Sequence, residues 1–242
     1  MTTREDWQRR LGPLYGGAVA LVSSTSWRWP TEVGDDARSA SWVVASGVPV
    51  GFAAWAIAAL LAAAGLPAHI AGLFGLVTLT AASAVLVERG LAERIDQWTR
   101  SARLSVPSIV VLVFTTVVRA AAVASLKPGQ WLMVFLATAV VGRWAAVFLQ
   151  ALGDSIHQDE SQRSLVATSS PAWLTAALSV AVATLAILAL GKVAIVALAL
   201  AAISAFALGL EAQRRDGALS APVVATAAAI GELLILLVAT IR

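Results

Sequence analysis

The sequence contains no cysteine, a single tyrosine and few charges: Asp, Glu, Lys and Arg together make up 13% of its 242 residues. The absence of cysteine excludes disulfide bonds and thiolate chemistry. Basic and acidic residues number 17 and 14, and a net charge of +3 is too small to suggest a nucleic-acid partner. No P-loop, GxSxG or HExxH motif occurs. The N-terminus mixes both charge signs and lacks the apolar core of a signal peptide, so we expect no removable leader.

Apolar residues, in contrast, are abundant and lie in long runs. They make up 59% of the chain, and the mean hydropathy is +0.83. About 20 apolar residues are enough to cross a bilayer as a helix, and runs of this length are too long for barrel strands. The sequence therefore predicts an all-α fold, a polytopic transmembrane helix bundle in a lipid bilayer. We expect one integral membrane domain over 1–242, with a tail and interfacial segment at 1–41 and the bundle at 42–241.

The apolar runs predict about seven spans and one shorter element. Residues 14–26 are too few for an ordinary span, so an interfacial or re-entrant helix is expected there, and whether it crosses the membrane stays open. Gly47 and Gly51 are spaced i, i+4, which favours close helix packing in lipid. The predicted spans lie near 42–64, 68–87, 104–125, 131–152, 172–190, 192–210 and 221–241.

The distribution of basic residues predicts the orientation. With the N-terminal tail and the connections 88–103, 153–171 and 211–220 on one side, that side collects twelve arginines and thirteen of the fourteen acids. The opposite side holds three basic residues, Lys127, Lys192 and Arg242. Because the more basic side is usually cytoplasmic, we expect a multi-pass protein of the cell inner membrane whose N-terminus and charged loops face the cytoplasm.

The segment 88–103 is the first candidate site, because it holds three acids and four arginines between two apolar runs. If it is helical, Glu93 and Asp96 share one face. Arg89 with Glu93, and Asp96 with Arg100, then form i, i+4 pairs. Paired carboxylates beside arginines could hold Mg²⁺ and a phosphate group. The alternative is a salt-bridged helix at the membrane edge with no ligand.

Two further groups of polar residues are candidates. Three charged residues lie within predicted spans, where an unpaired charge is costly, so we expect Glu232 to pair with Arg119 or Arg143. Such a pair could be structural or could bind a substrate. The 153–171 connection is long, and it is either a solvated loop or part of a metal site formed by Asp154, His157, Asp159 and Glu160.

The run from Val87 to Asp96, Val-Glu-Arg-Gly-Leu-Ala-Glu-Arg-Ile-Asp, resembles a motif of the cobalamin synthase family, the adenosylcobinamide-GDP ribazoletransferases. The family reads His-Leu-Asp-Gly-Leu-Ala-Asp-x-x-Asp at this place. Glu93 is a conservative replacement, while Arg89 stands at the first aspartate and Glu88 lies one position early. The matching residues are Gly90, Leu91, Ala92 and Asp96.

Other segments follow the family's order along nearly the whole chain. The family has a Gly-Gly-x-Thr-Gly-Asp segment before its last span, and its aspartate is Pro222 here. At the position of a later glutamate in the same helix of the family, this chain has Ala229. The segments that resemble the family elsewhere are Ser23–Pro30, Val48–Gly51, Arg100–Arg103, Gly142–Arg143 and Ile230–Leu233.

The resemblance implies a Mg²⁺-dependent transferase that joins α-ribazole, or its phosphate, to adenosylcobinamide-GDP with loss of GMP. The partners would then be a nucleotide-activated corrinoid and α-ribazole. Glu93 and Asp96 would be the catalytic residues and would share the metal with Glu88. The phosphate would lie on Arg100, Arg103 and Arg143.

Because several acidic positions of the family are replaced, two other hypotheses stay open. The chain could be a catalytically degenerate homologue that acts as a membrane scaffold or partner subunit, in a homo-oligomer or with another membrane protein. It could also be a small transporter whose pathway contains Arg119, Arg143 and Glu232. Carboxylates gathered around a metal favour the enzyme, separated carboxylates neutralised by arginine favour the scaffold, and a polar cavity reaching both faces favours the transporter.

Overall fold

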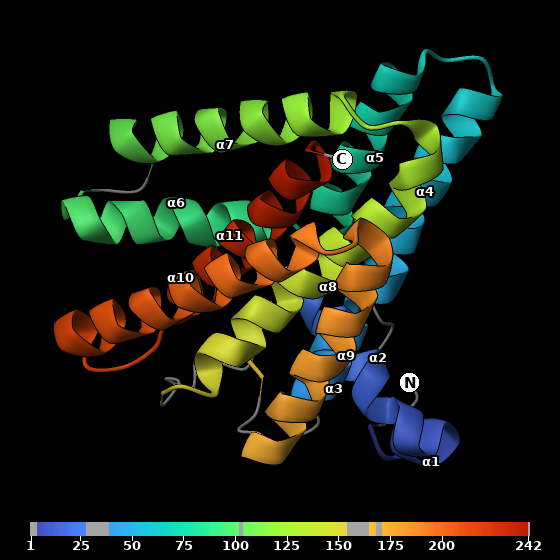
Figure 1. Ribbon diagram of the computed structural model, residues 1–242. Helices are drawn as coiled ribbons and strands as arrows, with labels where there is room; N and C mark the ends of the chain where they lie inside the picture. The colour runs from blue at the N-terminus through green and yellow to red at the C-terminus, as the bar shows by residue number, and fades with distance from the viewer. Residues whose placement is uncertain (1–3, 28–38, 102–103, 154–164, 168–170, 242) are drawn as a thin grey trace.

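The computed structural model describes residues 4–27, 39–101, 104–153, 165–167 and 171–241 (Figure 1). Within these residues, six helices are long and apolar enough to cross a membrane, and a seventh span results if the bent pair α5–α6 is counted as one. This confirms the all-α, multi-pass prediction. The helices are α1 (Arg4–Leu11), α2 (Tyr15–Ser24), α3 (Ala40–Ala45), α4 (Gly47–Ala63), α5 (Ala68–Ala82), α6 (Leu86–Thr99), α7 (Val106–Ala124), α8 (Trp131–Gln150), α9 (Ala172–Leu190), α10 (Val193–Asp216) and α11 (Ala221–Ala239), with short 3-10 turns η1 (Gly12–Leu14) and η3 (Pro128–Gln130).

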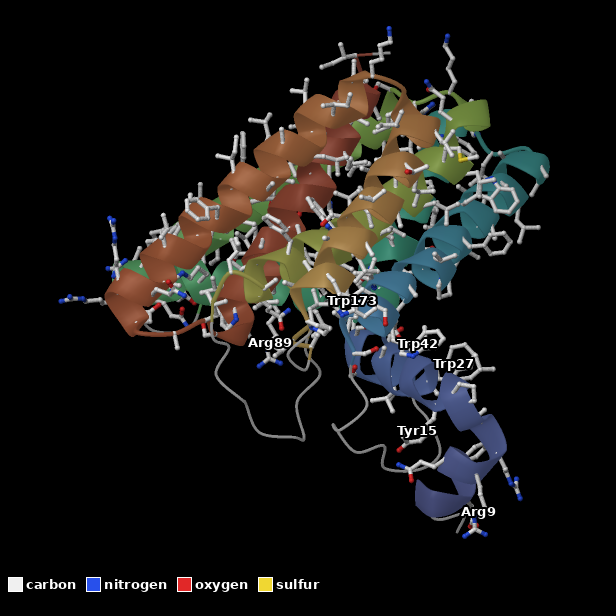
Figure 2. All side chains as sticks on the ribbon, turned by 60° about the horizontal axis from the view of Figure 1, so that its bottom comes forward. Arg9, Tyr15, Trp27, Trp42, Arg89 and Trp173 are labelled. Carbon is white, nitrogen blue, oxygen red and sulfur yellow. The ribbon has the colours of Figure 1, made fainter. Side chains whose placement is uncertain are left out.

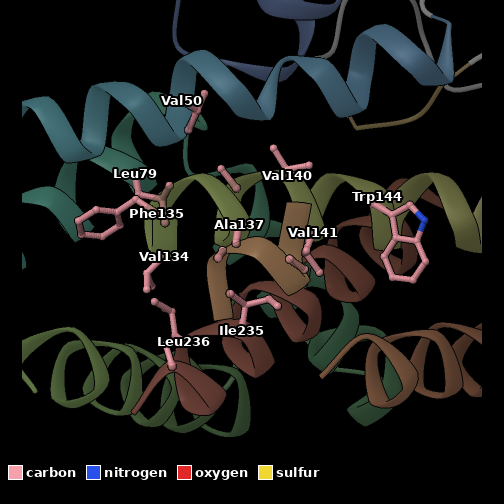
Figure 3. Close-up of a cluster of buried hydrophobic side chains, with 14 of the residues drawn as sticks. Val50, Leu79, Val134, Phe135, Ala137, Val140, Val141, Trp144, Ile235 and Leu236 are labelled. Atoms are coloured by element: carbon pink, nitrogen blue, oxygen red, sulfur yellow. The ribbon is translucent and has the colours of Figure 1, made fainter. Parts of the chain in front are cut away.

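The bundle is centred on α8 and α11. Most residues of these two helices are buried, whereas α7 and α9 expose most of theirs. Figure 3 shows the main core cluster, in which Val134, Phe135 and Val141 of α8 lie among side chains of α4, α5 and α11. The apolar side chains that remain exposed on the outer helices are those expected to face lipid, since a bilayer tolerates them as well as a core does.

Glycine allows α4 to pack closely on α8. A Cβ atom at Gly47 would lie 2.8 Å from the Ala139 carbonyl oxygen, and one at Gly51 would lie 2.7 Å from the Phe135 carbonyl oxygen. Both neighbours are backbone atoms of α8, so the two helices touch along their main chains. The close packing predicted from the i, i+4 spacing is therefore found.

The charged segment 88–103 is helical as far as Thr99, which is the condition under which Glu93 and Asp96 were expected to share one face. The span predicted at 68–87 ends at Ala82, and the helix α6 begins at Leu86, bent by 70° relative to α5. Ala84 and Val85 have positive φ angles of 54° and 58°. Two successive left-handed residues cannot continue a right-handed helix, which accounts for the break. The charged residues are thus carried on a helix packed against α11 and α7.

The N-terminal helices lie at one end of the bundle (Figure 2). Of the predicted 14–26 element, residues Tyr15–Ser24 form α2, which is too short to cross a bilayer. It packs against α3, where the Trp42 ring lies 3.0 Å from the position of a Cβ on Gly17. The predicted 42–64 span corresponds to α3 and α4, which meet at Ser46 and together form one candidate span, Ala40–Ala63.

Candidate functional site

Three charged side chains meet in the bundle interior, next to the α5–α6 break. Arg119 of α7 donates from Nη1 to Glu88 Oε1 at 2.6 Å and from Nη2 to Glu232 Oε2 at 2.7 Å. Thr80, on the other side of the break, donates to the same Glu88 oxygen at 3.1 Å. We call Glu88, Arg119 and Glu232 the central ion cluster. It confirms the predicted pairing of Glu232 with Arg119.

The pairing of Glu88 with Arg119 was not predicted, because the family resemblance assigned Glu88 to the metal site. A signal was nevertheless present. Helices α6 and α7 are neighbours joined by one short connection, and Glu88 and Arg119 lie about equally far from it along the chain. In an antiparallel helix pair such residues come to the same level, where opposite charges attract.

Arg143 is buried but is not the ion-pair partner of Glu232. It donates from Nε to Ser46 Oγ at 3.1 Å and from Nη2 to Ser83 Oγ at 3.3 Å. A third bond runs to the Ala139 carbonyl oxygen in its own helix. Ser46 lies between α3 and α4, and Ser83 lies at the α5–α6 break. Arg143 therefore links the junction of α3 and α4 to the α5–α6 break.

Glu93 forms the predicted i, i+4 pair with Arg89, at 2.7 Å between Nε and Oε1. Arg89 is 62% exposed and projects outward from the bundle (Figure 2). An exposed pair of this kind contributes at most about 1 kcal/mol to stability. Glu93 is thus held at the surface of α6, away from the central ion cluster.

Asp96 does not pair with Arg100 as predicted but stabilises the start of α7. Its Oδ1 accepts hydrogen bonds from the Ser105 N–H at 3.0 Å and the Ser108 hydroxyl at 2.6 Å, and also from the Ser105 hydroxyl. Its Oδ2 accepts from the Leu104 N–H at 2.7 Å. The N–H groups at a helix start have no partners within the helix, and a carboxylate satisfies them well. Both oxygens of Asp96 are therefore occupied.

Replacing Asp96 with asparagine should loosen the first turn of α7. The amide nitrogen cannot accept a hydrogen bond, and the negative charge at the helix start is lost. We expect amide hydrogen exchange in residues 105–110 to become about tenfold faster, the order expected for loss of an N-cap. Ser101→Ala, which removes an exposed hydroxyl of the same connection, is the control and should leave this exchange unchanged. Equal protection in Asp96→Asn and the parent would mean that the capping contacts are unimportant.

Arg94 forms a second ion cluster that sequence reasoning missed. It is 1% exposed and bonds to Asp216 Oδ2 at 2.7 Å and to Glu211, both of α10. Its guanidinium also stacks on Trp98, whose indole N–H donates to Glu211 at 3.1 Å. The spacing of Arg94 from the buried Val87 and Gly90 places all three on one helical stripe, which was the available signal.

The remaining predicted site residues are not brought to either cluster. Arg100 ends α6 in a left-handed conformation, with φ of 51°, and is exposed. Arg103 and the predicted loop residues Asp154, His157, Asp159 and Glu160 lie outside the described residues. Gly90, which matches the resembled motif, has a packing role: a Cβ there would lie 2.2 Å from the Ala225 Cβ of α11.

The three predicted metal ligands of α6 make contacts with other groups of the protein. Mg²⁺ is usually held by one or two carboxylates together with waters and phosphate oxygens. Both oxygens of Asp96 accept hydrogen bonds, one oxygen of Glu93 is paired with Arg89, and one of Glu88 is paired with Arg119. Within the described ranges, no three His, Cys, Asp or Glu residues converge in a way that could hold a metal. Glu88, Glu93 and Asp96 thus each have a different partner, which is Arg119 for Glu88, Arg89 for Glu93 and the start of α7 for Asp96.

Comparison of the chain with known proteins finds no relative. No family model, no curated protein and no solved structure matches the chain.

Proposed function

We propose that this chain is a non-catalytic membrane protein of the cobalamin synthase type, which acts as a scaffold or partner subunit. One observation carries the proposal: the two carboxylates at acidic positions of the resembled motif, Glu93 and Asp96, and the neighbouring Glu88 each hold two helices together or pair at the surface. Glu88 joins α6 to α7, Asp96 joins α6 to the start of α7, and Glu93 pairs within α6. A metal that used the oxygens already paired would have to displace these contacts.

The charge at the motif supports the same conclusion. Arg89 stands at a carboxylate position of the resembled motif, so a ligand is replaced by a cation within one turn of Glu93. At an effective dielectric constant of about 20, a unit charge 6 Å from a divalent ion repels it by roughly 5 kcal/mol before screening. A divalent ion is therefore disfavoured both by the loss of a ligand and by this repulsion.

The location follows the distribution of basic residues. The arginine-rich connections between spans favour a cytoplasmic position for the N-terminus and for the end of the bundle where α6 and α10 terminate. The cell membrane is the proposed site of action. A scaffold or subunit would there offer its charged end to cytoplasmic partners and its apolar helices to lipid or to another membrane protein.

Titration with Mn²⁺ tests the proposal. We expect the parent protein in detergent to show no saturable Mn²⁺ binding by paramagnetic resonance, and Arg89→Asp to bind no more tightly than the parent. Arg9→Asp, the same charge change on the exposed side of α1, is the matched control. Clear strengthening in Arg89→Asp but not in Arg9→Asp would show that the carboxylates of α6 form a metal site, and the proposal would fail.

The transferase is the second candidate, and one observation favours it. The Oε2 atom of Glu88 is buried and has no hydrogen-bond partner. A buried carboxylate oxygen without a partner is costly unless another group binds it at some stage. An enzyme of the resembled type would use this oxygen for a cation after Arg119 had released Glu88. The same Mn²⁺ titration separates the two candidates.

A further inference from the structure

The ends of α6 and α10 lie together at the same end of the bundle as the start of α7 (Figure 1). Arg94 of α6 bonds to Asp216 near the end of α10, and Arg215 of α10 donates to the Trp98 carbonyl oxygen at 3.4 Å. The last turns of the two helices are thus in direct contact. Arg100, Arg214 and Arg215, together with Trp98, form the surface that we call the basic patch.

The acids of this region do not neutralise the basic patch. Glu211 and Asp216 are directed toward the buried Arg94. Arg215 has only a longer contact with Glu211, at 3.5 Å, and is 44% exposed. Arg100 and Arg214 are exposed, and among the described residues no carboxylate oxygen lies within salt-bridge distance of either. With Asp96, whose oxygens are occupied by the start of α7, three carboxylates face four guanidinium groups, and the outward-facing charge is positive.

The basic patch lies where the bundle leaves the apolar layer. Helix α10 is apolar up to Leu210 and charged from Glu211 onward. Tryptophan and arginine at such a boundary are typical of the headgroup region of a bilayer. Trp98 is 37% exposed; its ring lies against Arg94, and its backbone carbonyl oxygen accepts from Arg215.

We infer that the basic patch binds the phosphodiester headgroup of an anionic phospholipid. Arginine recognises phosphate through several N–H donors in one plane, and three arginines on two adjacent helix ends offer such donors from two directions. The indole supplies the neighbouring apolar contact with the glycerol region. An acidic protein segment would need a partner that reaches the headgroup layer, whereas lipid is always present there.

Arginines in the last turn of a helix also complement the helix dipole. That role is local and does not depend on the lipid. If the arginines had only this role, their substitution would lower helix stability in every lipid and would leave the lipid preference unchanged. The two explanations therefore differ in the ratio of binding to anionic and neutral lipid.

The experiment is native mass spectrometry of the full chain in detergent, titrated with phosphatidylglycerol or phosphatidylcholine. We expect the parent to retain phosphatidylglycerol preferentially, and Arg100→Gln/Arg214→Gln to lose the preference by about fivefold for each arginine, the factor expected for one basic group at an anionic surface. Lys127→Gln/Lys192→Gln, which removes the same charge at the opposite end, should keep it.

Three results would overturn the inference. The double arginine variant could keep the parent's preference, or the lysine control could lose as much. Inorganic phosphate at the concentration of the lipid could displace phosphatidylglycerol, which would indicate a site for a free anion. A thermal midpoint measured in phosphatidylcholine verifies that each variant is folded, and the ratio of the two lipids within one variant stays informative even when stability falls.

Discussion

Replacing Arg119 with leucine should lower the stability of the protein more than any other single change considered. The substitution leaves Glu88 and Glu232 without their shared cation, and Glu232 is 2% exposed. Removing one partner of a buried ion pair typically costs about 3–5 kcal/mol. For a chain of this size the thermal midpoint in detergent should fall by roughly 10 °C. Fluorescence-detected size-exclusion chromatography after heating measures the change.

A compensated variant separates lost charge from lost packing. Arg119→Leu/Glu88→Gln/Glu232→Gln carries no buried charge in the central ion cluster, and replacing a whole buried ion cluster is often nearly neutral. We expect it to recover most of the thermal midpoint lost by Arg119→Leu. If Arg119→Leu alone is as stable as the parent, the central ion cluster does not hold α6, α7 and α11 together.

The second large effect is expected at the contact between α4 and α8. Gly51→Ala places a Cβ 2.7 Å from both the Leu136 Cα and the Phe135 carbonyl oxygen. Neither atom can move without shifting the α8 backbone, so overpacking should cost about 1–3 kcal/mol. The thermal midpoint in detergent should fall accordingly.

Gly129→Ala is the matched control for Gly51→Ala. A Cβ at Gly129 would meet nothing within 4 Å, and the residue lies in the short turn η3 that precedes α8. We expect this variant to be as stable as the parent. If Gly51→Ala were also neutral, α4 could separate from α8 without cost, and the close approach would not be a determinant of the fold.

Hydropathy alone predicted the order and approximate limits of the six helices long enough to span a membrane, because long apolar runs leave few structures other than helices in a membrane. The span at 172–190 agrees with α9 to the residue, and those at 104–125 and 131–152 agree with α7 and α8 to within two residues. Ser105 before Pro107 also marks the start of α7, since serine caps helices and proline suits their first turn.

The α5–α6 break could not be predicted in the same way. Its left-handed residues are Ala84 and Val85, and neither is a glycine or an asparagine that would mark such a conformation. The break is stabilised by distant contacts, Ser83 with Arg143 and Glu88 with Arg119. Interactions between residues far apart in the chain decide the local conformation here, and such interactions cannot be predicted from the local sequence.

The candidate site was predicted only in part for a related reason. Spacing identified the pair Arg89–Glu93, and charge limited the partner of Glu232 to Arg119 or Arg143, of which the structure has Arg119. The partners of Asp96 depend on how the chain turns between α6 and α7, which brings Ser105 and Ser108 over its carboxylate. The resembled motif thus indicated which positions are polar. Which of these polar groups contact one another depends on the fold.

The most direct test of the non-catalytic account is a transfer assay on the protein reconstituted in liposomes. The reaction contains adenosylcobinamide-GDP and α-ribazole or its phosphate, with and without Mg²⁺, and the joined corrinoid product is measured. The account predicts no more product than in protein-free liposomes under either condition. Mg²⁺-dependent product that disappears in Glu93→Gln would contradict it and would establish the chain as an active transferase.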